Sequence, residues 1–453
     1  MKCNIDKGCA IMFKKFNYKS LEELQADMKN LGVDLNCSTN FNALAKPVQL
    51  KNHRIPNSVV AHPMEGGDAD KIGNPTDLTF RKYERVAKGG FGLIWVEAVS
   101  VCEEGRSNPG QLWINDKTLP GFKKLVQRTL KAAEEFHPKG ERPLLILQLQ
   151  HSGRYSKPMG KHAPIIASHI PELDERLHID ETYPLVTDEY LTNLIDQFVK
   201  AAVLAKEAGF DGVDVKACHG YLLHELLSCF NRKGEYGGSY ENRTKLMLTI
   251  IDKIKVAAPE LVLTSRINIF DAMPIGKGFG MAAPGTDEID LTEPIKLTKQ
   301  FVERGVELVS ITMGNPYYIP HINRPYDLGT YMPNENPLQG TYRLIKGAAD
   351  LQAAVPEAKI VGVGYSWFRG FSPYIAAAVL EEGKAAMIGY GRQILSYPDL
   401  YKDVIREGKF NLSKVCVACS KCSQLKRDVG TSGCVVRDTE AYLQLYKETY
   451  KKT

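Results

Sequence analysis

The sequence predicts a single (β/α)8 barrel, a TIM barrel, with an N-terminal helical extension and a short C-terminal tail. Eight short runs rich in apolar and β-branched residues recur along the chain, and segments with helical periodicity separate them. Runs that are apolar almost throughout are typical of buried parallel strands, and eight βα units close into a barrel. A doubly wound open sheet is the alternative, but no GxGxxG motif opens a first helix.

The predicted elements follow in order from the N-terminus. Residues 21–35 (LEELQADMKNLGVDL) place leucines at helical spacing, and we expect this amphipathic helix to cap one end of the barrel. A longer helix is predicted over 191–210. The eight predicted strands are 57–64, 92–99, 144–150, 212–217, 261–267, 307–312, 359–364 and 385–390. The chain is therefore divided into an N-terminal extension (1–46), a barrel (47–405) and a C-terminal segment (406–453).

Composition excludes several classes of partner. The formal net charge is +5 over 453 residues and the charges are interspersed, so we expect no nucleic-acid partner. No apolar run approaches the roughly 18 residues of a membrane span, and the N-terminus MKCNIDKGCA lacks a signal-peptide core. We therefore expect a cytoplasmic protein without a membrane partner. The sequence leaves the oligomeric state open, a homo-oligomer included.

The ten cysteines are unevenly placed, and four crowd into the tail. Cys416, Cys419, Cys422 and Cys434 form a C-x2-C-x2-C-x11-C pattern. Three close cysteines with a distant fourth are typical of iron–sulfur ligands. Structural zinc prefers two separated pairs or a mixture of cysteine and histidine, and free thiols are the third possibility. The tail is therefore predicted to bind an iron–sulfur cluster.

Four motifs at predicted strand ends resemble those of the old yellow enzyme family, the NADH:flavin oxidoreductases. They are AHPM (61–64), QLQHSGR (148–154), HGYLLHELLSCFNRKGEYGGSYENR (219–243) and GYGRQILSYPDL (389–400). They keep the family's order and cover roughly residues 50–405. The cysteine pattern resembles the branch that contains 2,4-dienoyl-CoA reductase and trimethylamine dehydrogenase, whose members bind a 4Fe-4S cluster there. The spacing of the third cysteine is one residue shorter than in the dienoyl reductase.

The resemblance implies an FMN at the mouth of the barrel. Gln148 would hydrogen-bond the pyrimidine edge of the isoalloxazine, and Arg266 would lie against N1 and O2, where it stabilises the anionic reduced flavin. The other residues expected to flank the ring or hold the phosphate are Pro63, Met64, Glu65, Ala98, Gly364, Gly391 and Arg392. The alternative is that Arg266 is a surface or ion-paired arginine and that the glycines only form turns.

The catalytic residues implied by the resemblance follow the fourth strand. The family reads H-x-x-H-G-Y or H-x-x-N-G-Y there, and this chain has Lys216, His219 and Tyr221 at those positions. The first two residues of the motif hold the substrate's carbonyl oxygen, and the tyrosine protonates the α carbon. Lys216 departs from the family. Its ammonium can still stabilise a developing enolate, or it can form a salt bridge or contact flavin O2.

Other interpretations of this site remain. His219 could be a satisfied buried histidine, and Tyr221 could be a passive wall residue. One branch of the family takes its proton from a tyrosine after the first strand, but this chain has HPMEGGD there and no tyrosine. In MGNPYYIPHINRPY (313–326), Tyr317 and Tyr318 are expected to form an aromatic wall around a planar substrate, or else to belong to a structural loop.

These residues predict an FMN- and 4Fe-4S-containing ene-reductase that uses NAD(P)H to reduce the C=C bond of an α,β-unsaturated carbonyl compound. A flavone-type substrate is favoured, because the layout resembles clostridial reductases of flavones and enones. The sequence ends nineteen residues after Cys434, so we expect no further flavin or nucleotide domain. Electrons would come from NAD(P)H directly or from a separate electron-carrier protein. An amine dehydrogenase of the trimethylamine dehydrogenase type and an electron-transfer flavoprotein are the alternatives.

Overall fold

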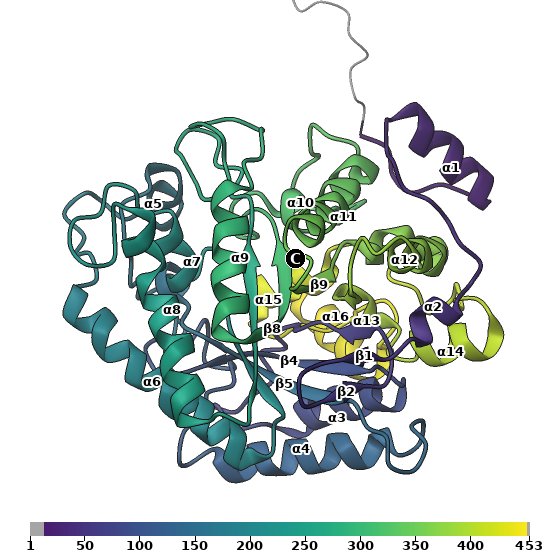
Figure 1. The fold of residues 1–453 in the computed structure, drawn as a ribbon, viewed down its shortest axis with the longest axis horizontal. Coiled ribbons are helices and arrows are strands. Elements are labelled where there is room, and N and C mark those ends of the chain that lie inside the picture. The colour runs from purple at the N-terminus through teal and green to yellow at the C-terminus, as the bar shows by residue number, and fades with distance from the viewer. Residues whose placement is uncertain (1–12, 451–453) are drawn as a thin grey trace, which may run out of the picture.

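The computed structural model describes residues 13–450 and contains a closed barrel of eight parallel strands (Figure 1). The strands are β3 (Val59–Ala61), β4 (Leu93–Ser100), β5 (Leu144–Gln150), β6 (Gly212–Val215), β7 (Val262–Asn268), β8 (Val306–Thr312), β9 (Lys359–Gly362) and β10 (Met387–Tyr390). They pair in chain order, and β10 closes the ring against β3. The predicted fold class is confirmed, and no strand extends more than one residue beyond its predicted range. The start of the predicted N-terminal extension (1–12) and residues 451–453 lie outside the described residues.

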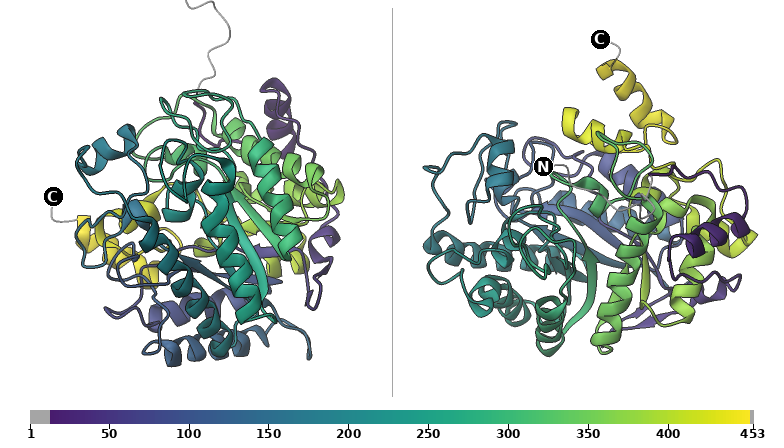
Figure 2. Two further views of the ribbon diagram at one scale, coloured as in Figure 1. Left: turned by 60° about the vertical axis from the view of Figure 1, so that its left-hand side comes forward. Right: turned by 90° about the horizontal axis from the view of Figure 1, so that it is seen from above.

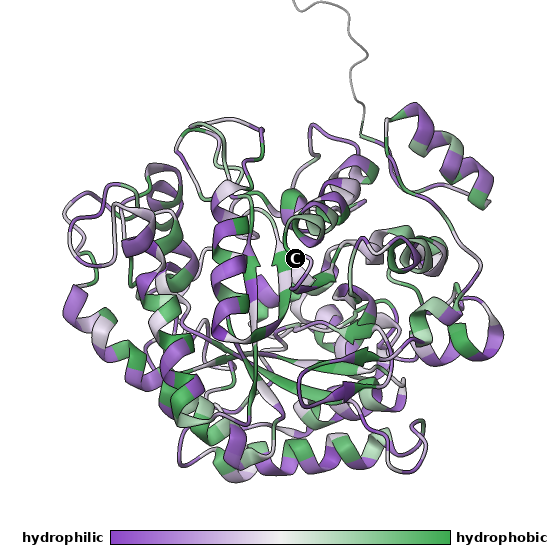
Figure 3. Cartoon of the chain, viewed as in Figure 1, coloured by the Kyte–Doolittle hydropathy of each residue, from purple (hydrophilic) through white to green (hydrophobic). Residues whose placement is uncertain are grey.

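Side chains alternate between the inside of the barrel and its outer surface. Leu93 and Trp95 of β4 belong to the core inside the barrel, whereas Ile94 and Val96 belong to the core shared with the helices. Both faces are therefore apolar, as Figure 3 shows by the green colour of the strands. This double burial explains why the strands read as almost continuous apolar runs.

Eight helices form a ring around the strands (Figure 2). They are α3 (Asp77–Lys88), α4 (Leu119–Ala133), α6 (Asp188–Ala208), α8 (Tyr240–Ala257), α9 (Thr292–Arg304), α11 (Pro337–Ala354), α12 (Ser372–Glu381) and α14 (Leu400–Glu407). α6 corresponds to the long helix predicted over 191–210. It buries Leu191, Leu194 and Phe198 at helical spacing, and Gly209 ends it in the left-handed conformation. No helix within residues 13–450 combines the length and the apolar character needed to cross a bilayer.

A hairpin, and not the predicted N-terminal helix, closes the end of the barrel where the strands begin. β1 (Val48–Gln49) and β2 (Arg54–Ile55) pair antiparallel, and Leu50 and Ile55 belong to the inner core. The predicted helix forms as α1 (Leu21–Asn30) but lies at the side of the molecule, near α11 and α12 in Figure 1. The barrel axis is narrow, so apolar side chains of a tight hairpin fill it, whereas a helix packs into a groove between other helices.

The opposite end of the barrel is elaborated by short elements in the loops that follow the strands. These are η1 (Gly153–Tyr155), α5 (Pro171–Leu177), α7 (Leu222–Leu227), α10 (Pro320–Asn323), η2 (Tyr365–Phe371) and α13 (Arg392–Ser396), while α2 (Asn42–Ala45) precedes the hairpin. The tail contains α15 (Lys421–Val429), the π-helical turn η3 (Thr439–Leu443) and α16 (Gln444–Tyr450).

The tail packs against the loop that follows β3. The Ser432 N–H donates to the carbonyl of Gly66 at 2.5 Å, and Arg81 of α3 forms an ion pair with Asp438 at 2.7 Å. Gly67 has φ +67°, and a Cβ at this position would lie 1.9 Å from the carbonyl oxygen of Gly430. Glycine is therefore required where the tail meets the barrel.

Candidate active site

One cavity of about 1190 Å³ opens at the ends of the strands, where a barrel places its functional loops. It is lined by all fourteen barrel residues that the sequence singled out. They are Pro63, Met64, Glu65, Ala98, Gln148, Lys216, His219, Tyr221, Arg266, Tyr317, Tyr318, Gly364, Gly391 and Arg392. The structure therefore brings together residues that come from all eight strands or from the loops that follow them.

The floor of the cavity is organised by the buried carboxylate of Asp214 on β6. Asp214 accepts hydrogen bonds from the Gln148 amide at 2.5 Å, from Trp95 Nε1 at 3.0 Å and from the backbone N–H of Arg266 at 2.8 Å. Burial raises the pKa of Asp214 to about 6. Because its amide nitrogen is engaged by Asp214, Gln148 keeps its amide oxygen for a donor in the cavity.

His219 and Tyr221 lie in a tight turn between β6 and α7. His219 has φ +68°, a strained conformation for a residue other than glycine. The turn is held by a buried chain of hydrogen bonds, in which the Gly220 N–H donates to His224 Nδ1 at 2.7 Å and His224 Nε2–H donates to Asp271 at 2.7 Å. These buried hydrogen bonds therefore hold the strained turn in place, and the turn determines where the His219 and Tyr221 side chains lie.

The Tyr221 hydroxyl contacts two partners at the rim of the cavity. It lies 3.3 Å from Glu65 Oε2 and 2.9 Å from the hydroxyl of Tyr317. Although burial opposes it, the charges of Lys426 and Lys216 hold the pKa of Glu65 below its usual range. Burial and the Glu65 charge raise the pKa of Tyr221 well above its usual value. Tyr221 is thus protonated and Glu65 ionised at neutral pH.

Lys216 and His219 bring donors to the same wall. The Lys216 ammonium lies 3.8 Å from the centre of the Tyr221 ring, and it has no carboxylate within 4 Å in residues 13–450. The salt-bridge interpretation of Lys216 is therefore not supported. Burial lowers its pKa, and burial with the nearby Arg266 and Lys216 charges lowers the pKa of His219 well below its usual value. His219 is a neutral donor or acceptor.

Four buried polar atoms in the cavity lining have no hydrogen-bond partner in the described part of the chain. They are His219 Nε2, Arg266 Nε, Arg324 Nε and Arg392 Nη1. Arg392 follows Gly391 at the start of α13, and its other terminal nitrogen donates to the carbonyl of Pro325 at 2.8 Å. Gly364, with φ +107°, forms the adjoining turn. Unpaired buried donors are costly, so this arrangement is suited to a polar ligand in the cavity.

The tail supplies a further charge to this site. Lys426 of α15 forms an ion pair with Glu65 at 2.8 Å, and Glu65 in turn contacts Tyr221. Ser107 and Asn108 also donate to Glu65. The predicted cluster segment therefore reaches the hydroxyl group of the candidate acid through two side chains.

The four tail cysteines line one small pocket beside Arg392 and α13. Burial raises the pKa of the Cys416 and Cys434 thiols, and the neighbouring Cys422 thiol raises both further. Ala418 and Ser420 adopt φ +51° and +56°, so the segment between Cys416 and Cys422 curls around the pocket. The structure thus places the four predicted ligands around one pocket, but no three of their sulfur atoms lie within 4.8 Å of one another among residues 13–450.

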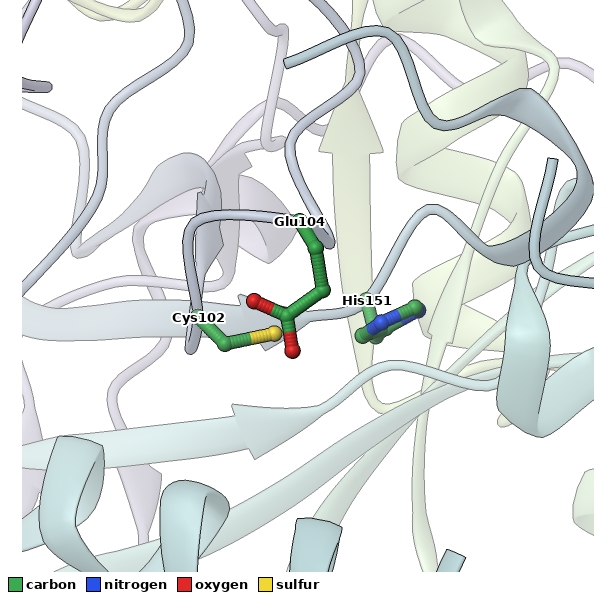
Figure 4. Close-up of side chains that lie close together, drawn as sticks. All are labelled: Cys102, Glu104 and His151. Atoms are coloured by element: carbon green, nitrogen blue, oxygen red, sulfur yellow. The ribbon is translucent and has the colours of Figure 1, made fainter. Parts of the chain in front are cut away.

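A second cluster of metal-ligating side chain types lies outside the cavity. Cys102, Glu104 and His151 approach one another in Figure 4. The Gly153 N–H donates to His151 Nδ1 at 3.0 Å, so Nε2 carries the proton of this ring and donates to Tyr190 at 2.9 Å. Burial lowers the pKa of His151 to about 4. The nitrogen that faces the cluster is therefore a donor, which favours a hydrogen-bonded support over a metal site.

Sequence reasoning missed several residues that line the cavity. Arg324 is contained in the tyrosine-rich segment 313–326, where its single charge gave a weak signal. Asp214 does not line the cavity itself but binds Gln148, which does, and an acidic residue inside an apolar predicted strand was the available signal. Lys426 and Arg176 gave no signal, because nothing in their local pattern points toward the barrel mouth.

Comparison with known proteins identifies relatives along most of the chain. The NADH:flavin oxidoreductase / NADH oxidase family matches residues 43–309, more than half of the 453 residues. NADPH dehydrogenase of Bacillus subtilis (strain 168) is 32% identical over 277 residues, 60% of this chain and 73% of that protein. NADH oxidase of Thermoanaerobacter brockii is 27% identical over 397 residues, 84% of this chain and 53% of that protein.

Two solved structures illustrate the shared fold. The complex of 2-naphthoyl-CoA reductase with 2-naphthoyl-CoA has a TM-score of 0.69 at 23% identity, over 90% of this chain and 58% of that chain. The old yellow enzyme homologue from Zymomonas mobilis has a TM-score of 0.59 at 21% identity, over 82% of this chain and 94% of that chain. The chain thus spans little more than half of the NADH oxidase and of the naphthoyl-CoA reductase.

Proposed function

The chain belongs to the NADH:flavin oxidoreductase / NADH oxidase family, which is the predicted old yellow enzyme family, and we propose that it is an ene-reductase. Family membership makes it an NAD(P)H-dependent flavin oxidoreductase. We propose further that it reduces the C=C bond of an α,β-unsaturated carbonyl compound. The observation that carries this proposal is the meeting of Lys216, His219 and Tyr221 on one wall of the cavity.

The unpartnered donors of the cavity fit FMN. Arg392 and Arg324, beside the turns at Gly364 and Gly391, provide free N–H groups for a phosphate. Arg266, which forms no ion pair within residues 13–450, provides a positive charge for the pyrimidine edge of the ring. Gln148, whose amide nitrogen donates to Asp214, would bind the same edge through its amide oxygen. The assignments of Gln148, Arg266 and Arg392 agree with the roles that the family resemblance implies, whereas Arg324 is added from the cavity lining.

The residues around the substrate have separate tasks in the proposed reaction. FMN, when bound, supplies the hydride that it takes from NAD(P)H. His219 and Lys216 hold the carbonyl oxygen, where negative charge develops. Tyr221 delivers a proton to the α carbon. Its raised pKa keeps the proton on the hydroxyl until a basic carbon forms, and the Lys216 ammonium above the ring stabilises the phenolate that remains.

The four tail cysteines fit a 4Fe-4S cluster. Half-buried thiols with raised pKa values become thiolates only beside a strong positive charge, and a metal cluster would provide it. The backbone N–H of Arg437 donates to Cys434 Sγ at 3.3 Å, a contact that stabilises a thiolate ligand. Zinc is the competing metal, and elemental analysis for iron, sulfide and zinc after anaerobic purification distinguishes the two.

Anaerobic mixing of the reduced protein with a substrate panel tests the reaction class. The panel contains an enone, a dienoyl thioester, a flavone and tertiary amines. We expect one of the unsaturated carbonyl compounds to reoxidise the flavin rapidly, with a flavone favoured. Reduction of the oxidised protein by an amine would instead support the amine dehydrogenase alternative. If only electron carriers reoxidised the flavin, Lys216, His219 and Tyr221 would have no substrate to act on, and the proposal would be contradicted.

A further inference from the structure

The cavity concentrates positive charge beyond what the chain carries as a whole. Its lining includes eight Lys or Arg side chains and two carboxylates, Glu65 and Asp428, which gives a formal charge of +6. The whole chain has a formal net charge of only +5. A surface that gathers one sign of charge in a concave site attracts ligands of the opposite sign.

Most of these cations already have a task or a partner. Lys216 is assigned above to the carbonyl oxygen, and the three arginines with a buried, unpartnered nitrogen are assigned to FMN. Lys426 is paired with Glu65 at 2.8 Å, and Arg427 is paired with Asp428 at 2.7 Å. Two cations of the lining remain, Lys157 and Arg176. Neither has a carboxylate within 4 Å among residues 13–450.

Arg176 is held in position without an ion pair among the described residues. It lies in the last turn of α5, and its guanidinium stacks 4.3 Å from the centre of the Tyr318 ring. One terminal nitrogen donates to the Tyr317 carbonyl at 3.2 Å. Stacking and one neutral hydrogen bond orient the planar group and leave its other N–H donors for a ligand. A guanidinium presented in this way favours bidentate binding of a carboxylate or phosphate.

Lys157 adds a second charge to the same cavity. It follows η1 in the chain and lines the cavity together with His162. Burial lowers the pKa of His162, and the Lys157 charge lowers it further, so the lysine and the histidine lie close to each other. His162 is therefore a neutral neighbour, and no carboxylate among residues 13–450 pairs with Lys157.

We infer that Arg176 and Lys157 form an anion anchor, and that a ligand entering the cavity carries a phosphate or carboxylate group. The inference rests on the proposed function, since the ligands concerned are NAD(P)H and the unsaturated carbonyl substrate. The anchored anion has two possible sources, a phosphate of the nicotinamide cofactor or an acidic group of the substrate. Arg176 bonds the backbone of Tyr317, whose hydroxyl contacts Tyr221. The anchor thus fixes a ligand next to the proposed acid.

The test compares Arg176→Gln with Arg427→Gln, a matched control that removes a cavity arginine already paired with a carboxylate. Flavin reduction is followed against NADPH and NADH concentration. Steady-state constants are measured for 2-cyclohexen-1-one and its 3-carboxylate. We expect Arg176→Gln to weaken the binding of one anionic ligand about ten- to hundredfold. The neutral enone and the control variant should stay within about twofold of wild type, and Arg176→Lys should recover part of the loss.

The pattern of losses identifies the source of the anion. A loss with NADPH alone assigns the 2′-phosphate, a loss with both nucleotides assigns the pyrophosphate, and a loss with the carboxylated enone assigns the substrate. If neither enone oxidises the wild-type flavin, the ene-reductase proposal fails while the nucleotide measurements still test the anchor. Inorganic pyrophosphate, titrated against the flavin absorption, probes the anchor without turnover. Unchanged binding of both nucleotides, the carboxylated enone and pyrophosphate in Arg176→Gln and in the double variant with Lys157→Gln would overturn the inference.

Discussion

Tyr221 combines a raised pKa with contacts that hold its hydroxyl at the cavity wall. Glu65 accepts on one side, and Tyr317 lies on the other at 2.9 Å. An ionised Glu65 can only accept, so one phenol proton in this group points toward the carboxylate. A substrate that takes the Tyr221 proton leaves a phenolate beside Glu65, and the Tyr317 hydroxyl is placed to donate to it.

Replacing Tyr221 with Phe should separate the two half-reactions. The variant keeps the ring and loses the proton, so flavin reduction by NAD(P)H should persist while oxidation by the enone slows about 10²–10⁴-fold. Anaerobic stopped-flow absorption of the flavin measures both rates. Tyr317→Phe serves as the control for loss of a neighbouring hydroxyl. An oxidative rate within about threefold of wild type would place the acid elsewhere, or assign the proton to solvent.

Lys216→Met should act on the substrate's carbonyl oxygen. Methionine has a similar length but no charge, and removal of one oxyanion donor costs about 10²–10³-fold in the chemical step. Substrate binding and hydride transfer should both weaken, and the rate of flavin reduction should be the least affected. Single-turnover kinetics of each half-reaction provide the measurement. An effect confined to flavin reduction would assign Lys216 to the cofactor, the alternative in which it contacts flavin O2.

At the scale of elements, the tail is joined to the barrel by few apolar contacts and several polar ones. Its own core consists of Leu425, Val435 and Tyr442. Tyr442 also donates to Asp68 at 3.1 Å, and Arg81 and Arg85 of α3 pair with Asp438. So small a core orders few residues by itself, and a metal cluster would add the constraint that it lacks.

Cys419→Ser should remove the cluster and loosen the tail. Because the barrel has its own core, its circular dichroism should remain while limited proteolysis cuts after about residue 405. Iron and sulfide content and the cleavage pattern are the measurements. Cys102→Ser, which changes a buried cysteine outside the tail, is the matched control. Full iron content in Cys419→Ser would remove this residue from the ligand set.

The Glu65–Lys426 ion pair links the tail to the barrel in a pH-dependent way. The pKa of Glu65 is lowered in the folded protein, so its contribution to stability is present above the usual value of 4.5 and is lost as pH falls through the lowered value. A double-mutant cycle of Glu65→Gln and Lys426→Gln, with urea unfolding at each pH, should give a coupling energy that is complete at pH 7. The same coupling should shrink below pH 4.5. A coupling that stays constant down to pH 3 would show that the pair is not ionic.

At the scale of the whole molecule, the cavity is lined by residues from the loops that follow the barrel strands. A ligand that fills it contacts many of these loops at once, so it should stabilise the entire fold. Saturating the apoprotein with FMN at about 100 times its dissociation constant should raise the free energy of unfolding by about 2.7 kcal/mol. Thermal unfolding with and without FMN is the measurement. Arg266→Ala should need more FMN for the same shift, because its charge supports the pyrimidine edge. If the unfolding temperature did not change when FMN was added, the assignment of this cavity to the cofactor would be contradicted.

The sequence alone identified the barrel and the wall on which its site lies. Eight apolar runs and the helices between them are local patterns, and parallel strands that alternate with helices bring their carboxyl ends to one mouth. Motif positions such as Gln148, Arg266 and Arg392 could therefore be placed in one cavity before any contact was known. The position of α1 was wrong, because an amphipathic pattern shows that a helix has an apolar face but not which groove receives it.

Only the tertiary structure decided which side chains meet across the mouth. Glu65 contacts Tyr221 from 156 positions away and Lys426 from 361 positions away, and no local spacing encodes such pairs. The same holds for Arg176, which is positioned by the Tyr317 carbonyl and the Tyr318 ring from a different loop. The periodicity of a sequence shows which face of a segment is buried. The contacts of long loops depend instead on packing and electrostatics in the assembled barrel. The sequence therefore determined which motif residues form the site, and the tertiary structure determined which charged side chains surround Tyr221.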